Sequence, residues 1–516
     1  MAKYLYGSRV NQIQSLIFET SKLKEIIGAS ELVEQICTAK FEESFAPNAF
    51  QKEQRIQGAA GIITYLFEDL DECQQIVYDF HQKISTEIPG IQLTQALVKF
   101  DGALNENHLR QLEEKLSIQR TITQVPHGLG LMISERSRRT GGAAVQIVDK
   151  EERLDRKQAC KRRYQERNKN TLLDKMFNTE DPIYKGSFAL EIEDLMGGQE
   201  QGWVAIVHAD GNGLGNLIRD SIKKITTSNG NLQDFLKQFS ENLNKATELA
   251  SKDAFREVIA PVFAQEKVIN DADNKKTYLP IRPVLLGGDD LTVIIRGDLA
   301  LPFTEAFLRG FERHTQSNLA ALNPDLFSDG LTSCAGIAYI KPKYPFHYGV
   351  DLAETLCKHA KNQAKDLALG KPGKAPSALF FHRVLSSFVD KDFESLVERE
   401  LYCKASEVGF DFGPYFLQEQ ANFESITQLR KWAFTIQKEK APKAPLREWL
   451  TELEINNESA QQLLDRIKNI NREFVKPLKL DAPYVLRNEL NEKNQEVINK
   501  KTHLYDVITL ASIEKN

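Results

Sequence analysis

Apolar and polar positions alternate in two ways along the larger part of this chain. Short apolar runs predict β-strands, and stretches with apolar residues three or four positions apart predict helices. Near its start the chain shows the order strand, helix, hairpin, helix, strand, in residues 4–10, 13–45, 55–57 with 62–67, 70–86 and 92–100. The same order recurs in residues 204–209, 214 onward, 284–296, 301–322 and 333–339. We therefore expect an α+β fold containing two ferredoxin-like (βαββαβ) modules.

The two modules and the sequence around them divide the chain into four expected domains. The first module covers residues 1–105 and the second covers 201–388, with a helix-rich connector, 106–200, between them. After Val389 the pattern changes to helices joined by polar segments. We expect residues 389–516 to form a mostly helical domain that binds or braces, because it has none of the residue patterns of a chemical site.

Two adjacent carboxylates lie at the tip of the hairpin in the second module. Apolar runs flank the tetrapeptide Gly287-Gly288-Asp289-Asp290 on both sides. Aspartate is rare inside strands and costly to bury without a cation, so this pair predicts a divalent metal site. The alternative is a solvated turn, which glycine and aspartate also favour. The matching segment of the first module, residues 58–61, has no carboxylate, so we expect the chemistry in the second module.

A third carboxylate, Asp210, follows the continuous apolar run Val204 to Ala209, which is typical of a buried strand. If this strand lies beside the hairpin, Asp210, Asp289 and Asp290 converge on a site that suits a hard cation. The glycines that come next, in Gly211-Asn212-Gly213-Leu214-Gly215, let backbone N–H groups approach an anion at the start of a helix, which favours phosphate. Together these features indicate nucleotide chemistry.

Composition narrows the class of protein. The 516 residues, 41% hydrophobic and 27% charged, suffice for several packed domains, and the net charge of -5 gives no global case for nucleic-acid binding. The cysteines include no CxxC pair and the histidines no HExxH or His-Asp pair, so neither a zinc knuckle nor a histidine-metal hydrolase is expected. Because the sequence shows no apolar run of spanning length and no leader pattern at residues 1–11, we expect a cytoplasmic protein without membrane contact.

One segment is locally basic. Residues 150–169 contain nine Lys or Arg against four acids, including Lys161-Arg162-Arg163. A charge run of this kind predicts a solvated helix face. The alternative is a local contact with RNA or phosphate, which the exposed loop expected at residues 134–142 would extend.

The motifs in combination resemble those of a known family. His208-Ala209-Asp210-Gly211-Asn212-Gly213, the hairpin with Asp289 and Asp290, and the later Ala360-Lys361 are similar to the large, polymerase-like subunit of type III CRISPR effector complexes. Residues 13–33 resemble the first palm domain of that family. The resemblance covers most of residues 1–366 and is weaker in the tail. The Gly-Gly-Asp-Asp motif alone would equally suggest a diguanylate cyclase, whose motif continues with Glu and Phe where this chain has Asp290 and Leu291.

The resemblance implies two palm domains that make a cyclic or linear oligonucleotide signal from ATP when the complex recognises foreign RNA. It implies two Mg²⁺ or Mn²⁺ ions held by Asp210, Asp289 and Asp290, and Lys361 as the residue that neutralises the phosphates. The implied partners are guide RNA, other subunits of the complex, and target RNA as activator. The implied nucleotide-binding positions are Gly211, Asn212, Gly213, Gly215, Gly287 and Gly288.

Two departures from the family leave other interpretations open. Many members begin with a histidine-aspartate nuclease domain and carry a cysteine-rich zinc element between the palms. This sequence starts directly at the palm and has only Cys160 in the corresponding region, so we expect neither DNA cleavage in cis nor a structural zinc. The chain would then be either a subunit of an RNA-guided complex or a stand-alone nucleotide cyclase of a related defence system. A stand-alone cyclase could form a homo-oligomer. A third interpretation is a non-catalytic scaffold that holds RNA.

Overall fold

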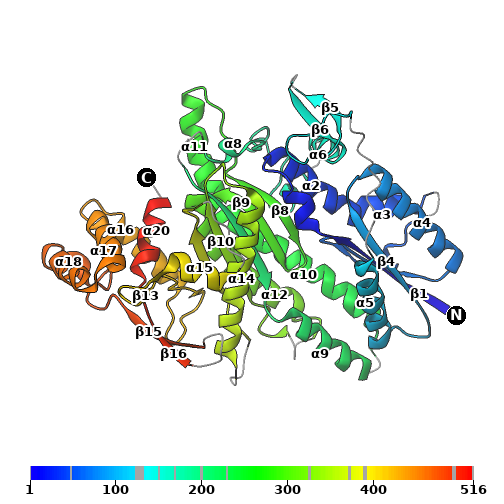
Figure 1. Cartoon of the computed structure of the whole chain (residues 1–516). Helices are drawn as coiled ribbons and strands as arrows, with labels where there is room; N and C mark the ends of the chain where they lie inside the picture. The colour runs from blue at the N-terminus through cyan, green and yellow to red at the C-terminus, as the bar shows by residue number, and fades with distance from the viewer. Residues whose placement is uncertain are drawn as a thin grey trace.

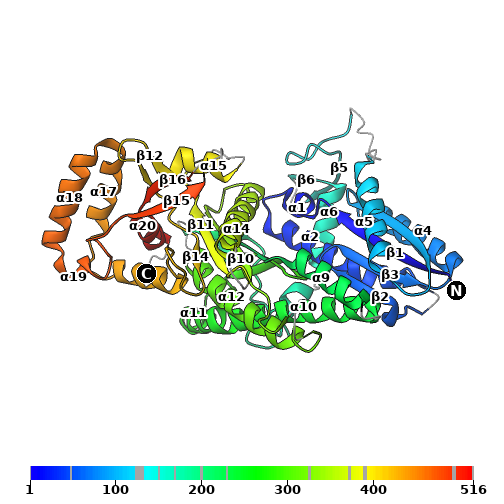
Figure 2. The same cartoon turned by 90° about the horizontal axis from the view of Figure 1, so that it is seen from below.

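The computed structural model describes residues 2–46, 49–122, 133–148, 151–167, 170–197, 202–227, 230–323, 327–369, 374–386, 392–490 and 496–513. Three parts follow one another through the molecule: the first module at one end, the second in the middle, and the C-terminal part at the other end (Figures 1 and 2). None of the described helices combines the length and the apolar character needed to cross a bilayer.

The first module has the predicted ferredoxin-like topology. Its antiparallel sheet has the order β2-β3-β1-β4, with helices inserted between β1 and β2 and between β3 and β4. The strands are β1 (Ala2–Asn11), β2 (Arg55–Ala59), β3 (Ile62–Phe67) and β4 (Gln92–Asp101). The helical elements are α1 (Ile13–Phe18), α2 (Leu23–Gln35), a π-helical turn (Ile36–Lys40), α3 (Phe41–Glu43) and α4 (Leu70–Glu87).

The long helix predicted for residues 13–45 is wrong in one respect, because the chain breaks between α1 and α2. The Thr20 hydroxyl accepts a hydrogen bond from the backbone N–H of Lys22 at 3.1 Å, a local bond that competes with the helical pattern. The break turns α2 so that its long apolar face covers the sheet, where Leu23, Ile26 and Leu32 are buried.

The second module repeats this topology inside a larger sheet of order β14-β11-β10-β7-β9-β8. Its strands are β7 (Val204–Gly211), β8 (Ile281–Gly287), β9 (Asp290–Arg296) and β10 (Ser333–Ile340), extended by β11 (Ala378–Arg383) and β14 (Tyr415–Phe416). Its helices are α9 (Leu214–Thr227), α10 (Leu232–Ala254), α11 (Ala260–Ala272), α12 (Gly297–Leu319) and α14 (Phe346–Ala368), with a π-helical turn (Phe255–Ile259) before α11. The prediction of two ferredoxin-like modules is therefore confirmed.

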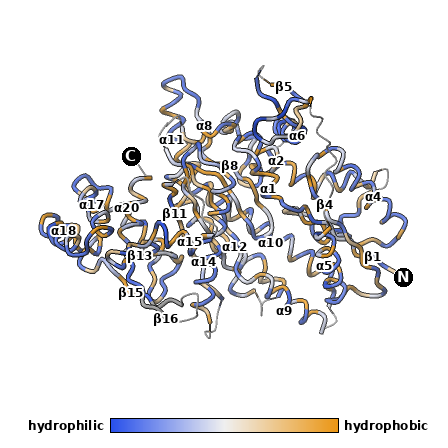
Figure 3. The backbone as a smooth tube through the Cα atoms, in the orientation of Figure 1, coloured by the Kyte–Doolittle hydropathy of each residue, from blue (hydrophilic) through white to orange (hydrophobic). Residues whose placement is uncertain are grey.

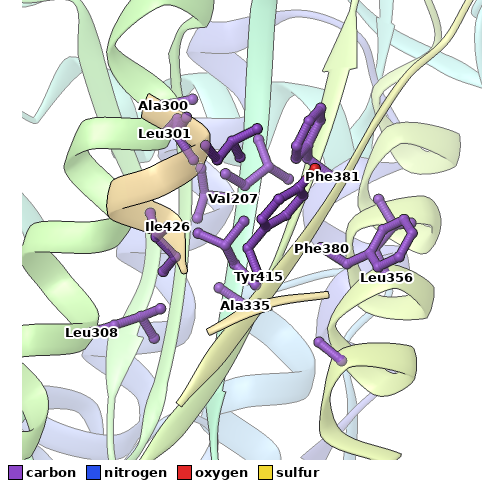
Figure 4. Close-up of a cluster of buried hydrophobic side chains, with 14 of the residues drawn as sticks. Val207, Ala300, Leu301, Leu308, Ala335, Leu356, Phe380, Phe381, Tyr415 and Ile426 are labelled. Carbon is purple, nitrogen blue, oxygen red and sulfur yellow. The ribbon is translucent and has the colours of Figure 1, made fainter. Parts of the chain in front are cut away.

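Both faces of the second sheet are covered, which explains why β7 is apolar without interruption. Along β7, Ala205 and Val207 belong to one buried cluster, whereas Val204 and Ile206 belong to another that includes the start of α14. Figure 4 shows side chains of α12 and α16 on one side of the strands and Leu356 of α14 on the other. Hydrophobic segments are concentrated in this central sheet (Figure 3). The sheet is therefore a stiff support for the residues at its ends.

The connector packs mainly against the first module. Helix α5 (Glu106–Thr121) covers the face of the first sheet opposite α2, burying Leu112 and Leu116. After it come β5 (Ala144–Val148), β6 (Glu152–Asp155), α6 (Arg156–Glu166), α7 (Thr171–Asp174) and α8 (Ile192–Leu195).

Neither interpretation of the basic segment fits Lys161 and Arg162 of α6, whereas Arg156 and Arg163 of the same helix are exposed, as expected for a solvated face. This helix lies so close to α2 that a Cβ atom on Gly28 would meet the Lys161 carbonyl oxygen at 1.8 Å. Lys161 and Arg162 are buried, and their partners are carboxylates: Glu19 for Lys161, and Glu25 and Glu152 for Arg162. These cations join the connector to the first module, so they form neither a solvated face nor a free phosphate site.

The C-terminal part is mostly helical, as expected, and it also contains a small sheet that the sequence pattern did not predict. The helical elements are α15 (Phe393–Leu396), a π-helical turn (Val397–Leu401), α16 (Ile426–Ile436), α17 (Lys443–Ile455), α18 (Asn457–Ile470), α19 (Arg472–Val475) and α20 (Leu504–Ile513). The sheet has the order β12-β13-β16-β15, from Tyr402–Cys403, Val408–Gly409, Glu496–Lys501 and Val485–Leu490. The first two of these strands have only two residues each, which is too short to leave a recognisable alternation.

Candidate active site

Three carboxylates predicted to converge do lie together at one end of the second sheet. Asp210 is near the end of β7, Asp290 begins β9, and Asp289 lies in the turn before it. Strands β7 and β9 are antiparallel with Ala209 opposite Leu291, which brings the next residue, Asp210, beside Asp290. One carboxylate oxygen from each of the three aspartates lies within 4.8 Å of those from the others. The structure thus forms an acidic cluster from two segments 79 residues apart (289 minus 210).

The cluster is electrostatically strained without a cation. Burial, and then the charge of Asp210, raises the pKa of Asp289 to about 6. Burial, followed by the charges of Asp289 and Asp210, raises the pKa of Asp290 well above its usual value. Lys361 of α14 forms an ion pair with Asp210, and although burial lowers the pKa of this lysine, the carboxylate outweighs burial and raises it. One ammonium balances only one of three carboxylates, so the site fits divalent cations that prefer oxygen ligands.

At two positions near the cluster, Gly211 and Gly288, glycine is favoured for different structural reasons. A Cβ atom on Gly211 would lie 2.7 Å from Asp289 Oδ2, so only glycine allows β7 and the hairpin turn to approach this closely. Gly288 has φ of +64°, a left-handed conformation that glycine adopts without strain. Helix α10 holds the turn, because Asn244 Oδ1 accepts from the Gly288 N–H at 3.2 Å and the Thr247 hydroxyl donates to the Gly288 carbonyl at 2.6 Å.

The predicted phosphate segment forms a short loop before α9. Gly213 has φ of +68°, and a Cβ atom on Gly213 or on Gly215 would meet no other atom within 4 Å, so space is open at the start of this helix. Asn212 differs from its neighbours. Its side-chain amide donates to Thr332 Oγ1 at 3.1 Å and to the Pro376 carbonyl at 3.4 Å, so in this structure it anchors the loop to the residue before β10 and to the segment before β11.

Two side chains of the site have no recognisable signal in the sequence. Glu354 lies two helical turns before Lys361 on α14, and it accepts a hydrogen bond from Gln14 of α1 in the first module. Burial, then the charges of Asp351 and Asp210, raises the pKa of Glu354 to about 7. Once α14 was predicted, the seven-residue spacing could have indicated a shared face, but nothing in the sequence indicates the contact with Gln14.

The two modules meet beside the acidic cluster. A Cβ atom on Gly287 would lie 3.7 Å from the Cβ atoms of Ala59 and Ala60, so the hairpin of the second module contacts the hairpin of the first. A cavity of about 270 Å³ opens next to this contact, with Asp289 and Gly288 on one side and Arg9 of β1 on the other. Most of the remaining lining is apolar and comes from α5, α9 and α10. Asp289 of the cluster therefore faces a space shared by both modules.

The fold and this site define a class: proteins with two polymerase-like palm domains, of which the second carries the acidic residues. Residues 203–368 match the family model described as Cas10/Cmr2, second palm domain. The resemblance predicted from the sequence motifs is thereby confirmed.

The whole chain is similar in fold to crystal structures of a Csm1-Csm4 cassette. The cassette in complex with pppApApA gives a TM-score of 0.53 at 13% identity, covering 99% of this chain and 69% of that chain. The complex with cA3 gives a TM-score of 0.52 at 12% identity, covering 100% of this chain and 70% of that chain. The complex with one ATP gives 0.52 at 12% identity, covering 99% and 69%. A search of curated proteins gave no match.

Proposed function

We propose that this chain is a metal-dependent nucleotidyltransferase that joins ATP molecules into an oligoadenylate, cyclic in its final form, as a signal in antiviral defence. The observation that carries the proposal is the cluster of Asp210, Asp289 and Asp290 inside the segment that matches the second palm domain. Cassettes of the same fold occur in complex with ATP, pppApA and cA4, which supports adenine nucleotides as the substrate class.

The residues of the site have different proposed roles in binding metal ions and phosphate. The three aspartates would hold two Mg²⁺ or Mn²⁺ ions, and these ions would activate a ribose hydroxyl of the substrate and stabilise the departing pyrophosphate. Lys361 exchanges Asp210 for phosphate oxygens once the carboxylate is neutralised. The open backbone at Gly213 and Gly215 accepts phosphate at the start of α9. Gly211, Gly287 and Gly288 keep side chains away from the nucleotide and the carboxylates. No side-chain base is required.

The decisive experiment incubates the purified chain with each of the four nucleoside triphosphates and Mg²⁺ or Mn²⁺, and identifies products by mass spectrometry. We expect oligoadenylates from ATP, and we expect the Asp289→Ala/Asp290→Ala variant to fold normally and to lose product by about 10³-fold or more. Undiminished product from the double variant would refute the assignment of the site. Cyclic diguanylate from GTP would favour a diguanylate cyclase, and no product under any condition would favour a scaffold.

We further propose that the chain works as the large subunit of a type III CRISPR complex, with guide RNA and other subunits as partners and target RNA as the activator. The similarity of the whole chain to Csm1 in cassettes with Csm4 supports this proposal. Adding target RNA to the assembled complex should stimulate synthesis strongly. If the isolated chain is fully active and forms a homo-oligomer in solution, a stand-alone cyclase is the better description.

A further inference from the structure

A second cavity lies at the opposite end of the second palm sheet from the acidic cluster. Its volume is about 480 Å³, within the range of small-molecule sites. Trp203, immediately before β7, and Arg383, the last residue of β11, line its palm side. Arg447 of α17 and Tyr505 of α20 line the side formed by the C-terminal part. The length of β7 separates this cavity from Asp210 by roughly 20 Å, so the two sites are distinct.

The figures show the same arrangement of the surrounding elements. Helix α20 lies between α17 and the palm sheet in Figures 1 and 3, and it lies beside β11 in Figure 2. The cavity is therefore at a junction of two structural parts, where ligand sites are common.

Arg383 is a half-buried cation that has no counter-ion among the residues that the structure describes. Its Nη1 donates to the Ser512 hydroxyl, whereas its Nε is buried and has no hydrogen-bond partner among the described residues. Within the described part of the chain, no carboxylate lies at ion-pair distance from its guanidinium group. Its guanidinium carbon lies 5.6 Å from the centre of the Trp203 ring, which also has Lys341 Nζ at 3.9 Å. A desolvated guanidinium with a free donor favours an anion as ligand.

A second guanidinium group faces the same space. Arg447 is exposed on α17, and its charge, together with the dominant effect of burial, lowers the pKa of Arg383. Glu454, one more residue of α17, also lines the cavity but forms no ion pair with either arginine. The hydroxyl groups of Thr451, Thr509, Ser512 and Tyr505 complete the polar lining.

We propose that this cavity binds a phosphate-bearing ligand, with Arg383 and Arg447 as the residues that hold the phosphate group. Two guanidinium groups from opposing walls repel each other, and a phosphate dianion can neutralise both, whereas a single carboxylate can neutralise only one. Arginine also matches phosphate geometry with paired N–H donors. Inorganic phosphate alone would leave much of the 480 Å³ unfilled, so the volume favours a phosphate carried by a larger group of nucleotide size. The proposal does not depend on catalysis at Asp210.

Calorimetric titration of the full chain tests the proposal, with EDTA present so that no divalent cation binds at the acidic cluster. Inorganic phosphate and ATP are titrated separately into the wild type, Arg447→Gln, Arg383→Gln and the control Arg466→Gln. Arg466 is an exposed arginine on the neighbouring helix α18, so the control removes the same charge outside the cavity.

We expect the wild type and the control to bind ATP alike, and both cavity variants to bind at least tenfold more weakly. Arg447 is exposed, so its variant remains informative even if Arg383→Gln impairs folding. Binding of ATP but not of phosphate assigns the site to nucleotides, and equal binding of both assigns it to the phosphate group alone. The proposal is overturned if the wild type binds neither ligand, or if Arg447→Gln binds as tightly as Arg466→Gln.

Discussion

The two palm domains share one backbone design and differ in the charge at matching positions. In the first palm, Ala59 pairs with Ile62 across a two-residue turn, and in the second, Gly287 pairs with Asp290 in the same way. The turn residues are Ala60 and Gly61 in the first and Gly288 and Asp289 in the second. The two turns are thus equal in length, and only the hairpin of the second palm carries carboxylates at its tip.

The strand beside each hairpin shows the same contrast. In the first palm, Arg9 lies opposite Ile62. In the second, Ala209 lies opposite Leu291, so Asp210 takes the place that Arg9 has in the first palm. Arg9 forms an ion pair with Glu113 at 2.6 Å, whereas Asp210 joins an acidic cluster. The fold therefore does not determine the chemistry, because one register accommodates either a cation or a carboxylate of the acidic cluster.

The turns also differ in backbone conformation. Ala60 and Gly61 have φ of +50° and +79°, the pattern of a type I′ turn. In the second palm only Gly288 has a positive φ, at +64°, which is the pattern of type II′. A type II′ turn requires glycine only at its first central position. The second position is then open to a residue such as Asp289, whose side chain takes part in the cluster.

The comparison predicts its largest effect for substitutions of the matched pair Asp210 and Arg9. Asp210→Asn keeps the shape of the side chain but removes a charge of the proposed metal site, so we expect product formation to fall about 10³-fold. Arg9→Gln removes a cation that lines the cavity beside Asp289 but belongs to no metal site, so we expect a fall of at most about tenfold. Initial rates at saturating ATP and Mg²⁺ measure both effects.

A circular-dichroism spectrum and a melting curve for each variant serve as the control, because a loss of folded protein would also lower the rate. If Arg9→Gln proves as damaging as Asp210→Asn while remaining folded, the first palm takes a direct part in the chemistry. The division between a chemical and a supporting palm would then be wrong.

The sequence predicts some parts of this comparison and not others, for physical reasons. Period-two and helical patterns reveal the repeated topology because every strand of both palms has at least one buried face. The convergence of Asp210 with Asp289 and Asp290 follows from a strand end and a hairpin tip in one sheet. The contact between Gln14 and Glu354 depends on how the palms pack, and single polar residues leave no periodic signal. The ion pairs of α6 are missed because charge runs usually face solvent.

A smaller effect is expected on the free energy of unfolding, through the protonation of Asp289 in the second palm. The pKa of Asp289 rises from 3.8 in the usual case to about 6, so the folded state binds this proton more tightly than the unfolded state. The stability that protonation of Asp289 contributes is then fully present below pH 3.8, and this contribution is lost as the pH rises through about 6. The Asp289→Asn side chain does not ionise, so this variant does not lose stability as the pH rises. At pH 8 and without metal it should be more stable than the wild type by on the order of 1 kcal/mol.

Melting temperatures at pH 4, 6 and 8 in EDTA measure this difference, which should shrink toward pH 4. Saturating Mg²⁺ should stabilise the wild type and remove most of the gap, because binding to the folded state alone raises its stability. A gap of constant size across the pH range would show that charge repulsion at Asp289 is not its cause.

The smallest effects are expected at the first central positions of the two turns. The Cβ atom that Gly288→Ala adds would meet no other atom within 4 Å. The loss in the free energy of unfolding therefore comes only from the positive φ and should be about 1 kcal/mol. Ala60→Gly relieves the same strain but adds freedom to the unfolded chain, so the two terms should nearly cancel and leave a few tenths of a kcal/mol. Urea midpoints of both variants measure this contrast. Equal destabilisation by both would mean that neighbouring contacts, such as those from Asn244 and Thr247 of α10, dominate over backbone strain.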